Sequence, residues 1–174
     1  MRDDGESIGL RQGTLAIMRY DPVWAGLFEE ECASICAAVP ELELTVDHIG
    51  STAVPGLSAK PILDIAVRAL PIHENRIAAA LVRLGYIDRG IRSGRLFIRL
   101  RGTDIRTHNL HLYAPDDPDC RDQLLFRDAL RQDAQLCKRY ASLKHDLVDA
   151  LGGARAGYAD GKTDFVRAVL SSAG

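Results

Sequence analysis

The chain has 174 residues, of which 47% are hydrophobic and 26% are charged, and its formal net charge is −2 at pH 7. This length and composition are those of one soluble domain with a full hydrophobic core. The small net charge gives no electrostatic reason to expect duplex nucleic acid as a partner, although residues 89–106 could form a local basic patch.

Neither a membrane span nor a secretion signal is expected. No apolar stretch is long enough to cross a bilayer, and residues 1–13 lack the apolar segment of a secretion signal. We therefore expect a cytoplasmic protein without a membrane partner, with a loose leader over residues 1–13 and one domain over residues 14–174.

The first half of that domain alternates strands and helices. Helix starts are marked by Asp21-Pro22, where Asp serves as N-cap, and by His73 or Glu74. Apolar residues at helical spacing carry these helices to Pro40 and to Leu84, where Gly85 follows as a stop signal. The predicted strands of this half are Leu15–Arg19, Thr45–Ile49 and Ile62–Val67.

The second half begins with a hairpin and ends in helices. Residues 95–101 alternate Arg95, Phe97, Arg99 and Arg101 with Leu96, Ile98 and Leu100, which predicts a strand with one largely basic and one apolar face. A turn at Gly102–Asp104 returns the chain in the strand Ile105–Tyr113, and Tyr86–Asp88 is a weaker strand. Three helices are then predicted, over Cys120–Arg131, Ala134–Leu151 and Lys162–Leu170. The pattern predicts an α+β fold, with helices packed on one face of a single sheet.

The segment most informative about function is residues 45–67, T-V-D-H-I-G-S-T-A-V-P-G-L-S-A-K-P-I-L-D-I-A-V. It reads as a strand, a Gly-Ser turn, a Pro-Gly loop, a lysine and a second strand with a single acid, Asp64. A carboxylate in an apolar strand is costly unless a cation meets it, so a metal ion or a lysine is expected nearby.

The pattern H-I-G-S-T-x-V-P-G-L-x-x-K-P-I-x-D-I resembles that of the GrpB family, a branch of the nucleotidyltransferase (polymerase beta-like) superfamily. Two further motifs extend the resemblance to about Met18–Val169: R-T-H-x-L-H at residues 106–111, and a helical tail. The tail motif comprises Phe126–Arg131, Tyr140, Lys144, Tyr158 and Lys162. The resemblance implies a nucleotidyltransferase-like mixed β-sheet packed by helices, with a helical C-terminal tail.

The resemblance also implies a site. Phosphates would bind at the turn of Gly50, Ser51 and Thr52, because a glycine lets an anion approach the backbone and hydroxyls can donate to it. Asp64 would hold Mg²⁺ or Mn²⁺ that bridges the phosphates. The remaining candidates for anion binding are Lys60, Arg127 and Lys144. Each of these three could instead form structural ion pairs.

In one respect the chain departs from the superfamily pattern. A second acid usually stands two positions after the first, and here that position is Ala66. The later strand offers His108 and His111 in place of a third acid, which would suit Mn²⁺ or Zn²⁺, or no metal at all. Strand alternation puts the two histidines on opposite faces, and we choose His111 as the candidate. His48, before the Gly-Ser turn, is a candidate general base or a structural histidine.

The leading hypothesis is nucleotidyl transfer from a nucleoside triphosphate to an unknown small-molecule acceptor, with Asp64, His48 and His111 as catalytic residues. The alternative is a binding module that holds a nucleotide or a coenzyme A-type metabolite without turning it over. A third possibility is a ligase that activates a carboxylate by adenylation. The sequence does not indicate the oligomeric state.

Overall fold

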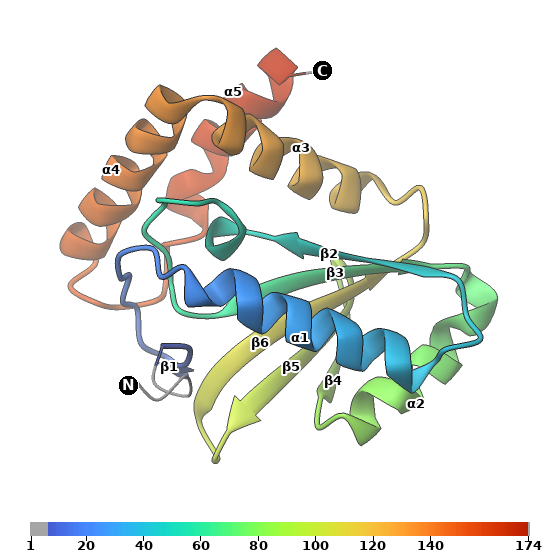
Figure 1. The fold of residues 1–174 in the computed structure, drawn as a ribbon. Helices are drawn as coiled ribbons and strands as arrows, with labels where there is room; N and C mark the ends of the chain where they lie inside the picture. The colour runs from blue at the N-terminus through green and yellow to red at the C-terminus, as the bar shows by residue number, and fades with distance from the viewer. Residues whose placement is uncertain (1–6, 174) are drawn as a thin grey trace.

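The computed structural model describes residues 7–173, and within them one mixed sheet forms the centre of the fold (Figure 1). The strands follow the order β2-β3-β6-β5-β4, and β1 pairs with the start of β6. Only the β3–β6 pair is parallel among the strand pairs of these residues, which makes the sheet mixed. Their bounds are Leu10–Arg11 (β1), Leu44–Ile49 (β2), Leu63–Ala69 (β3), Ile87–Arg92 (β4), Gly94–Arg101 (β5) and Ile105–Tyr113 (β6). The predicted α+β class and the hairpin of β5 and β6 are confirmed.

The helices lie close to their predicted positions because local signals set their ends. They are α1 (Val23–Ala38), α2 (Glu74–Arg83), α3 (Pro118–Gln132), α4 (Ala134–Ala150) and α5 (Thr163–Ala173). The carboxylates of Asp117 and Asp133 accept backbone N–H groups at the starts of α3 and α4, so each is an N-cap. Of the helices within residues 7–173, none has the length and apolarity needed to cross a bilayer.

Helices cover both faces of the sheet, which corrects the prediction of one covered face. Ile65, Val67 and Phe97 pack under α1 and α2 in the main core, whereas Ala66 on the opposite face packs with Cys120 of α3. In Figure 1, α1 crosses in front of the strands, and α3, α4 and α5 gather at the top of the view. Strand β3 is therefore buried on both sides, and only its two charged residues are half-exposed.

Two arginines on the basic face of β5, Arg95 and Arg99, form ion pairs with acidic side chains. Arg99 donates to both carboxylate oxygens of Glu31 on α1, at 3.0 and 2.6 Å. Arg95 pairs with Glu74 of α2 and with Asp88, at 2.8 and 2.6 Å. Arg95 and Arg99 thus attach the sheet to its helices. The alternation of arginine with apolar residues in this strand reflects these internal ion pairs.

The N-terminal segment differs from its prediction. Residues 1–6 of the predicted leader lie outside the described residues, but from Ser7 onward the chain is packed rather than loose. The Ser7 carbonyl accepts the indole N–H of Trp24 at 3.0 Å, and Ile8 is buried. The strand predicted over residues 15–19 is wrong, because this stretch makes only one isolated bridge, from Met18 to Ala59.

Candidate active site

The Gly50–Ser51 turn ends β2 and lies directly against Asp64 of the neighbouring strand. Gly50 has a φ of 70°, and a Cβ at this position would lie 2.7 Å from Asp64 Oδ2. Only glycine allows both this backbone conformation and this close approach. Ser51 then opens the short 3-10 turn Ser51–Ala53. The turn and the acid thus meet at one point.

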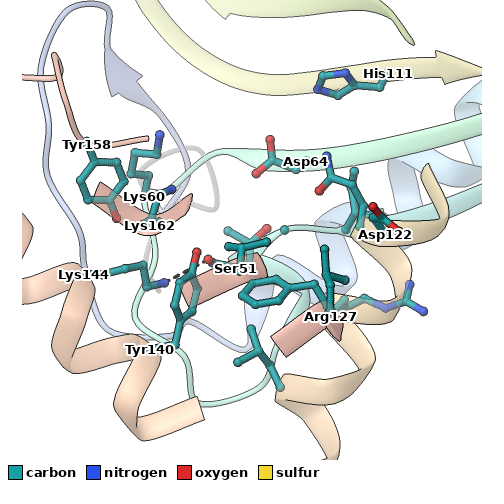
Figure 2. Close-up of a pocket in the computed structure, with 18 residues that line it drawn as sticks. Ser51, Lys60, Asp64, His111, Asp122, Arg127, Tyr140, Lys144, Tyr158 and Lys162 are labelled. Carbon is teal, nitrogen blue, oxygen red and sulfur yellow. Dashed lines mark hydrogen bonds between the residues drawn. The ribbon is translucent and has the colours of Figure 1, made fainter. Parts of the chain in front are cut away.

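A cavity of about 420 Å³ opens beside this point, between the sheet and the C-terminal helices (Figure 2). All the predicted site residues except His48 line it. Its charged lining side chains are Lys60, Asp64, Asp122, Arg127, Lys144 and Lys162. Figure 2 shows the three lysines on the side of the pocket near Tyr158, with Ser51 and Asp64 across from them. We call this cavity the lysine pocket.

Asp64 is held in place by the parallel pairing of β3 with β6. This pairing puts Asn109 beside Asp64, and the Asn109 amide donates to Asp64 Oδ1 at 2.8 Å. Lys60 supplies a nearby positive charge, because the Asp64 carboxylate raises the pKa of its ammonium group, although burial lowers that pKa more. Lys60 is therefore a cation close to this half-exposed acid, and a metal ion at Asp64 stays a prediction.

Lys144 is one of the most deeply buried side chains, at 1% exposure. Its ammonium group donates to Ser51 Oγ at 3.0 Å and to the Ser58 carbonyl, and it lies 4.8 Å from the centre of the Tyr140 ring. Burial, with a smaller effect of the neighbouring Lys162 charge, lowers the pKa of Lys144 to about 7. An ammonium group has three N–H donors, so one remains for a ligand.

The other two lysines approach the same space from different segments. Lys162 Nζ lies 4.3 Å and Lys60 Nζ 5.3 Å from the centre of the Tyr158 ring, within the range of cation–π attraction. Burial, followed by the charge of Lys60, lowers the pKa of Lys162 to about 8. The three ammonium groups therefore crowd one pocket, and an anion bound there would relieve their repulsion.

His111, the histidine chosen as the candidate from the sequence, lines the pocket above Asp64. Its Nδ1 lies 2.6 Å from the Ser93 carbonyl oxygen. Because a carbonyl can only accept, Nδ1 carries the proton in the neutral ring, and Nε2 is then the nitrogen with a lone pair. His111 can therefore accept a proton from a bound molecule.

His48 does not reach the pocket, so the structure does not bring it to the other candidates. Strand alternation turns it toward α1, where it stacks on Phe28 with ring centres 4.7 Å apart. Its Nε2 lies 2.9 Å from Thr52 Oγ1, and burial lowers its pKa to about 4. Thr52 also donates to the Ile62 carbonyl at 3.4 Å, so its hydroxyl serves the loop.

Arg127 lines the pocket but directs its guanidinium away from Ser51 and the lysines (Figure 2). It donates to the His48 carbonyl at 3.0 Å and to Asp128 at 2.7 Å. These contacts fix α3 against β2. They agree with the alternative that Arg127 forms a structural ion pair. Its role as a phosphate ligand stays a prediction.

The residues around Asp64 do not fit a metal centre held by the protein. Within residues 7–173, no group of three or more His, Cys, Asp or Glu side chains could hold a metal ion. The position of the second acid, Ala66, is fully buried in an apolar cluster with Ile49, Tyr113 and Cys120. Its partners on the neighbouring strands are Asp47 and His111, so a histidine rather than a second acid stands beside Asp64 on the pocket side. Asp64 as a ligand to a metal carried by a substrate stays a prediction.

Sequence reasoning gave no site role to several residues that line or support the pocket. Tyr140, Tyr158 and Lys162 appear in the tail motif only as points of resemblance, and Asn109 is a variable position of the second motif. Asp122 on α3 gave no signal, because its position depends on how α3 crosses the sheet. For Lys162, the scarcity of lysine in the chain was an available signal.

Comparison with known proteins gives one consistent family. The model of the family described as GrpB protein matches residues 14–172. A UPF0157 protein of Streptomyces coelicolor is 35% identical over 161 residues, which cover 92% of this chain and 84% of that protein. The crystal structure of the conserved protein GrpB from Enterococcus faecalis has a TM-score of 0.80 at 30% identity and covers 91% of this chain and 96% of that one. A cytoplasmic RNA terminal U-transferase gives only a TM-score of 0.48 at 16% identity, over 76% of this chain and 41% of that one, which carries no argument about activity.

Proposed function

The chain belongs to the GrpB family, and we propose that it transfers a nucleotidyl group from a nucleoside triphosphate to a small-molecule acceptor in the lysine pocket. One observation carries the proposal: Ser51, Asp64 and three lysines from separate segments converge on one cavity of about 420 Å³. Such a volume lies in the range of small-ligand sites, roughly 300–1,000 Å³. The spacing of the Gly-Ser turn and Asp64 supports the same reaction class.

The phosphates of the donor would lie on the lysine side of the pocket. Ser51 and the free N–H of Lys144 can donate to phosphate oxygens, and Lys60 and Lys162 add positive charge. Pyrophosphate gains negative charge as it leaves, so the same lysines would stabilise the transition state. A divalent ion arriving on the triphosphate would be part of the substrate, and Asp64 is the carboxylate nearest the turn.

An acceptor has room in a second cavity of about 650 Å³, which shares Asp122, Tyr140 and Lys162 with the lysine pocket. Among the described residues, Asp122 has no hydrogen-bond or ion-pair partner, although it borders both cavities. It is therefore available to accept a hydrogen bond from a hydroxyl or amine of the acceptor. Asp122 orients the acceptor in this proposal.

The reaction then follows from the positions of these groups. The acceptor oxygen or nitrogen forms a bond to the α-phosphorus, and the bond from that phosphorus to pyrophosphate breaks. The acceptor proton passes to Nε2 of His111, the nitrogen that bears the lone pair in the neutral tautomer fixed by Ser93. His48 takes no part, because it faces α1.

A second candidate function is a binding module for a nucleotide or a coenzyme A-type metabolite. The observation in its favour is the apolar packing of Ala66, which leaves Asp64 as the one acid of its strand. In this case the lysine pocket would hold the phosphates without turnover.

The test incubates the protein with each α-labelled nucleoside triphosphate and a pool of small metabolites containing alcohols, amines and carboxylates. Nucleotidyl transfer predicts a new labelled product and pyrophosphate release, both lost in Asp64→Ala. Nucleotide or coenzyme A binding without any labelled product would favour the binding module. If neither compound class binds, both functions are wrong.

A further inference from the structure

The second acid of the superfamily pattern is absent from this chain, because its position is Ala66. Ala66 is fully buried, and its neighbours Ile49, Tyr113 and Cys120 form an apolar cluster around it. The next strand supplies Asn109 opposite Asp64, and that amide already donates to the carboxylate. Negative charge on a phosphate chain must therefore be balanced by something other than ions bound to a pair of acids.

The chain concentrates its lysines at this place. It contains 4 lysines and 18 arginines, so arginine is its usual cation. Three of the lysines, Lys60, Lys144 and Lys162, line the pocket, and the fourth, Lys138, is exposed on α4. A lysine ammonium group is a compact point charge that can gain or lose its proton in a buried site, unlike a guanidinium. The pocket thus uses the cation type that is rare elsewhere in the chain.

We propose that Lys60, Lys144 and Lys162 bind the phosphate oxygens directly and supply the charge balance of a second metal ion, so that the pocket binds phosphate chains without a divalent metal. This inference rests on the proposed function, because it concerns how that site holds its donor. The ligand class is a polyphosphate: inorganic pyrophosphate or the phosphate tail of a nucleotide.

Binding should draw protons into the pocket. In the free protein, burial lowers the pKa of each of the three lysines, and repulsion from the other lysines lowers it further for Lys144 and Lys162. Two tyrosine rings face them, and Asp64 opposes the effect for Lys60 and Lys162. Cys137 raises the pKa of Lys144, as Asp64 does for Lys60 and Lys162. Arg155 and Arg106 lower the pKa of Lys60. A bound phosphate chain adds negative charge to this set, so the lysines become fully protonated as it binds.

The experiment is NMR of protein labelled with ¹³C at the lysine Cε, which gives one signal for each of the 4 lysines. Pyrophosphate and a nucleoside triphosphate are added at pH 8 with excess EDTA, and then with Mg²⁺ instead. We expect the signals of Lys144 and Lys162 to move toward their protonated positions without metal and the Lys60 signal to shift on contact with the phosphates, while Lys138 stays unchanged. Sodium chloride at matched ionic strength is the control for nonspecific screening.

Affinity measurements separate this inference from the proposed function. Lys162→Met should weaken metal-free binding of pyrophosphate about 10- to 100-fold, as expected for a lost hydrogen bond to a charged group. Lys138→Met should leave it unchanged. Binding that appears only with Mg²⁺ would overturn the metal-free inference and leave the proposed function standing. Failure of pyrophosphate and nucleotides to bind under either condition would overturn both.

Discussion

Replacing Lys144 by methionine should remove a specific dependence of stability on pH. The Lys144 side chain is 1% exposed and its pKa is lowered to about 7, chiefly by burial. In the unfolded chain the same group has an ordinary pKa of roughly 10.4. Methionine has a similar length and no charge to bury, so Lys144→Met isolates the ammonium group while filling its space.

The magnitude follows from linkage. Between pH 7 and pH 10 the unfolded chain keeps the Lys144 proton, whereas the folded chain loses it. The free energy of unfolding therefore rises with pH, by at most about 1.4 kcal/mol per pH unit. Because Lys144 is half protonated near pH 7 in the folded protein, its contribution should grow by about 2 kcal/mol from pH 7 to pH 9. Below pH 7 this contribution levels off.

Urea unfolding at pH 7 and pH 9, followed by the fluorescence of the single tryptophan, Trp24, measures this difference. The rise from pH 7 to pH 9 should be about 2 kcal/mol larger in wild type than in Lys144→Met. Lys138→Met, an exposed lysine on the same helix, should behave as wild type. If wild type and Lys144→Met show the same pH dependence, the ammonium group is not disfavoured by the fold, and the reasoning about the pocket's charge fails.

Three further predictions concern the Arg99–Glu31 ion pair, the backbone at Gly50 and the chemistry of Asp64. Arg99→Met should destabilise the protein by roughly 3–5 kcal/mol, measured by urea unfolding, because Glu31 is left buried without its charged partner. Adding Glu31→Gln should recover most of that loss, and no recovery would show that the ion pair is not the cause. Gly50→Ala should destabilise by more than about 1 kcal/mol and weaken nucleotide binding, because its positive φ and its approach to Asp64 exclude a Cβ. Gly56→Ala has a similar φ but open space around it, so an equal effect there would point to backbone strain alone. Asp64→Asn should keep nucleotide binding in EDTA while abolishing turnover, measured by pyrophosphate release; unchanged turnover would remove Asp64 from the chemistry.

Local sequence signals account for much of the fold. The helix starts predicted at Cys120 and Ala134 and the stop at Gly85 lie within a residue or two of the observed helix ends, and the structure shows that Asp117 and Asp133 cap the two starts. That helices cover both faces of the sheet was harder to predict from the sequence, because it depends on where α3 crosses the sheet. The run Leu63–Ala69, apolar except for Asp64 and Arg68, nevertheless carried a sign of it, since a strand buried on both sides lacks regular alternation.

The candidate site also combines residues that local sequence signals identify with residues that only tertiary packing brings together. The motif identified the turn at Ser51 and the acid Asp64, because these residues are close in sequence and their spacing sets their contact. Side chains alternate between the two faces of β2, so His48 lies on the face opposite to Asp47 and Ile49. The sequence alone does not indicate which of these faces borders the pocket. Lys144 and Lys162 come from segments about 80 to 110 residues further on, so only tertiary packing brings them to Ser51. The arginines of β5 suggested a basic patch because their acidic partners, Glu31 and Glu74, lie on helices distant in sequence.

The most direct test of the phosphate-binding pocket is a thermal-shift panel of nucleoside triphosphates, pyrophosphate and coenzyme A on wild type, Lys162→Met and Lys138→Met. A ligand at 100 times its Kd adds about 2.7 kcal/mol of stability, which should raise the Tm of wild type and Lys138→Met by roughly 5–10 °C. We expect Lys162→Met to lose most of that rise. No rise with any ligand, or an equal rise in Lys162→Met, would contradict the assignment of the lysine pocket as the binding site.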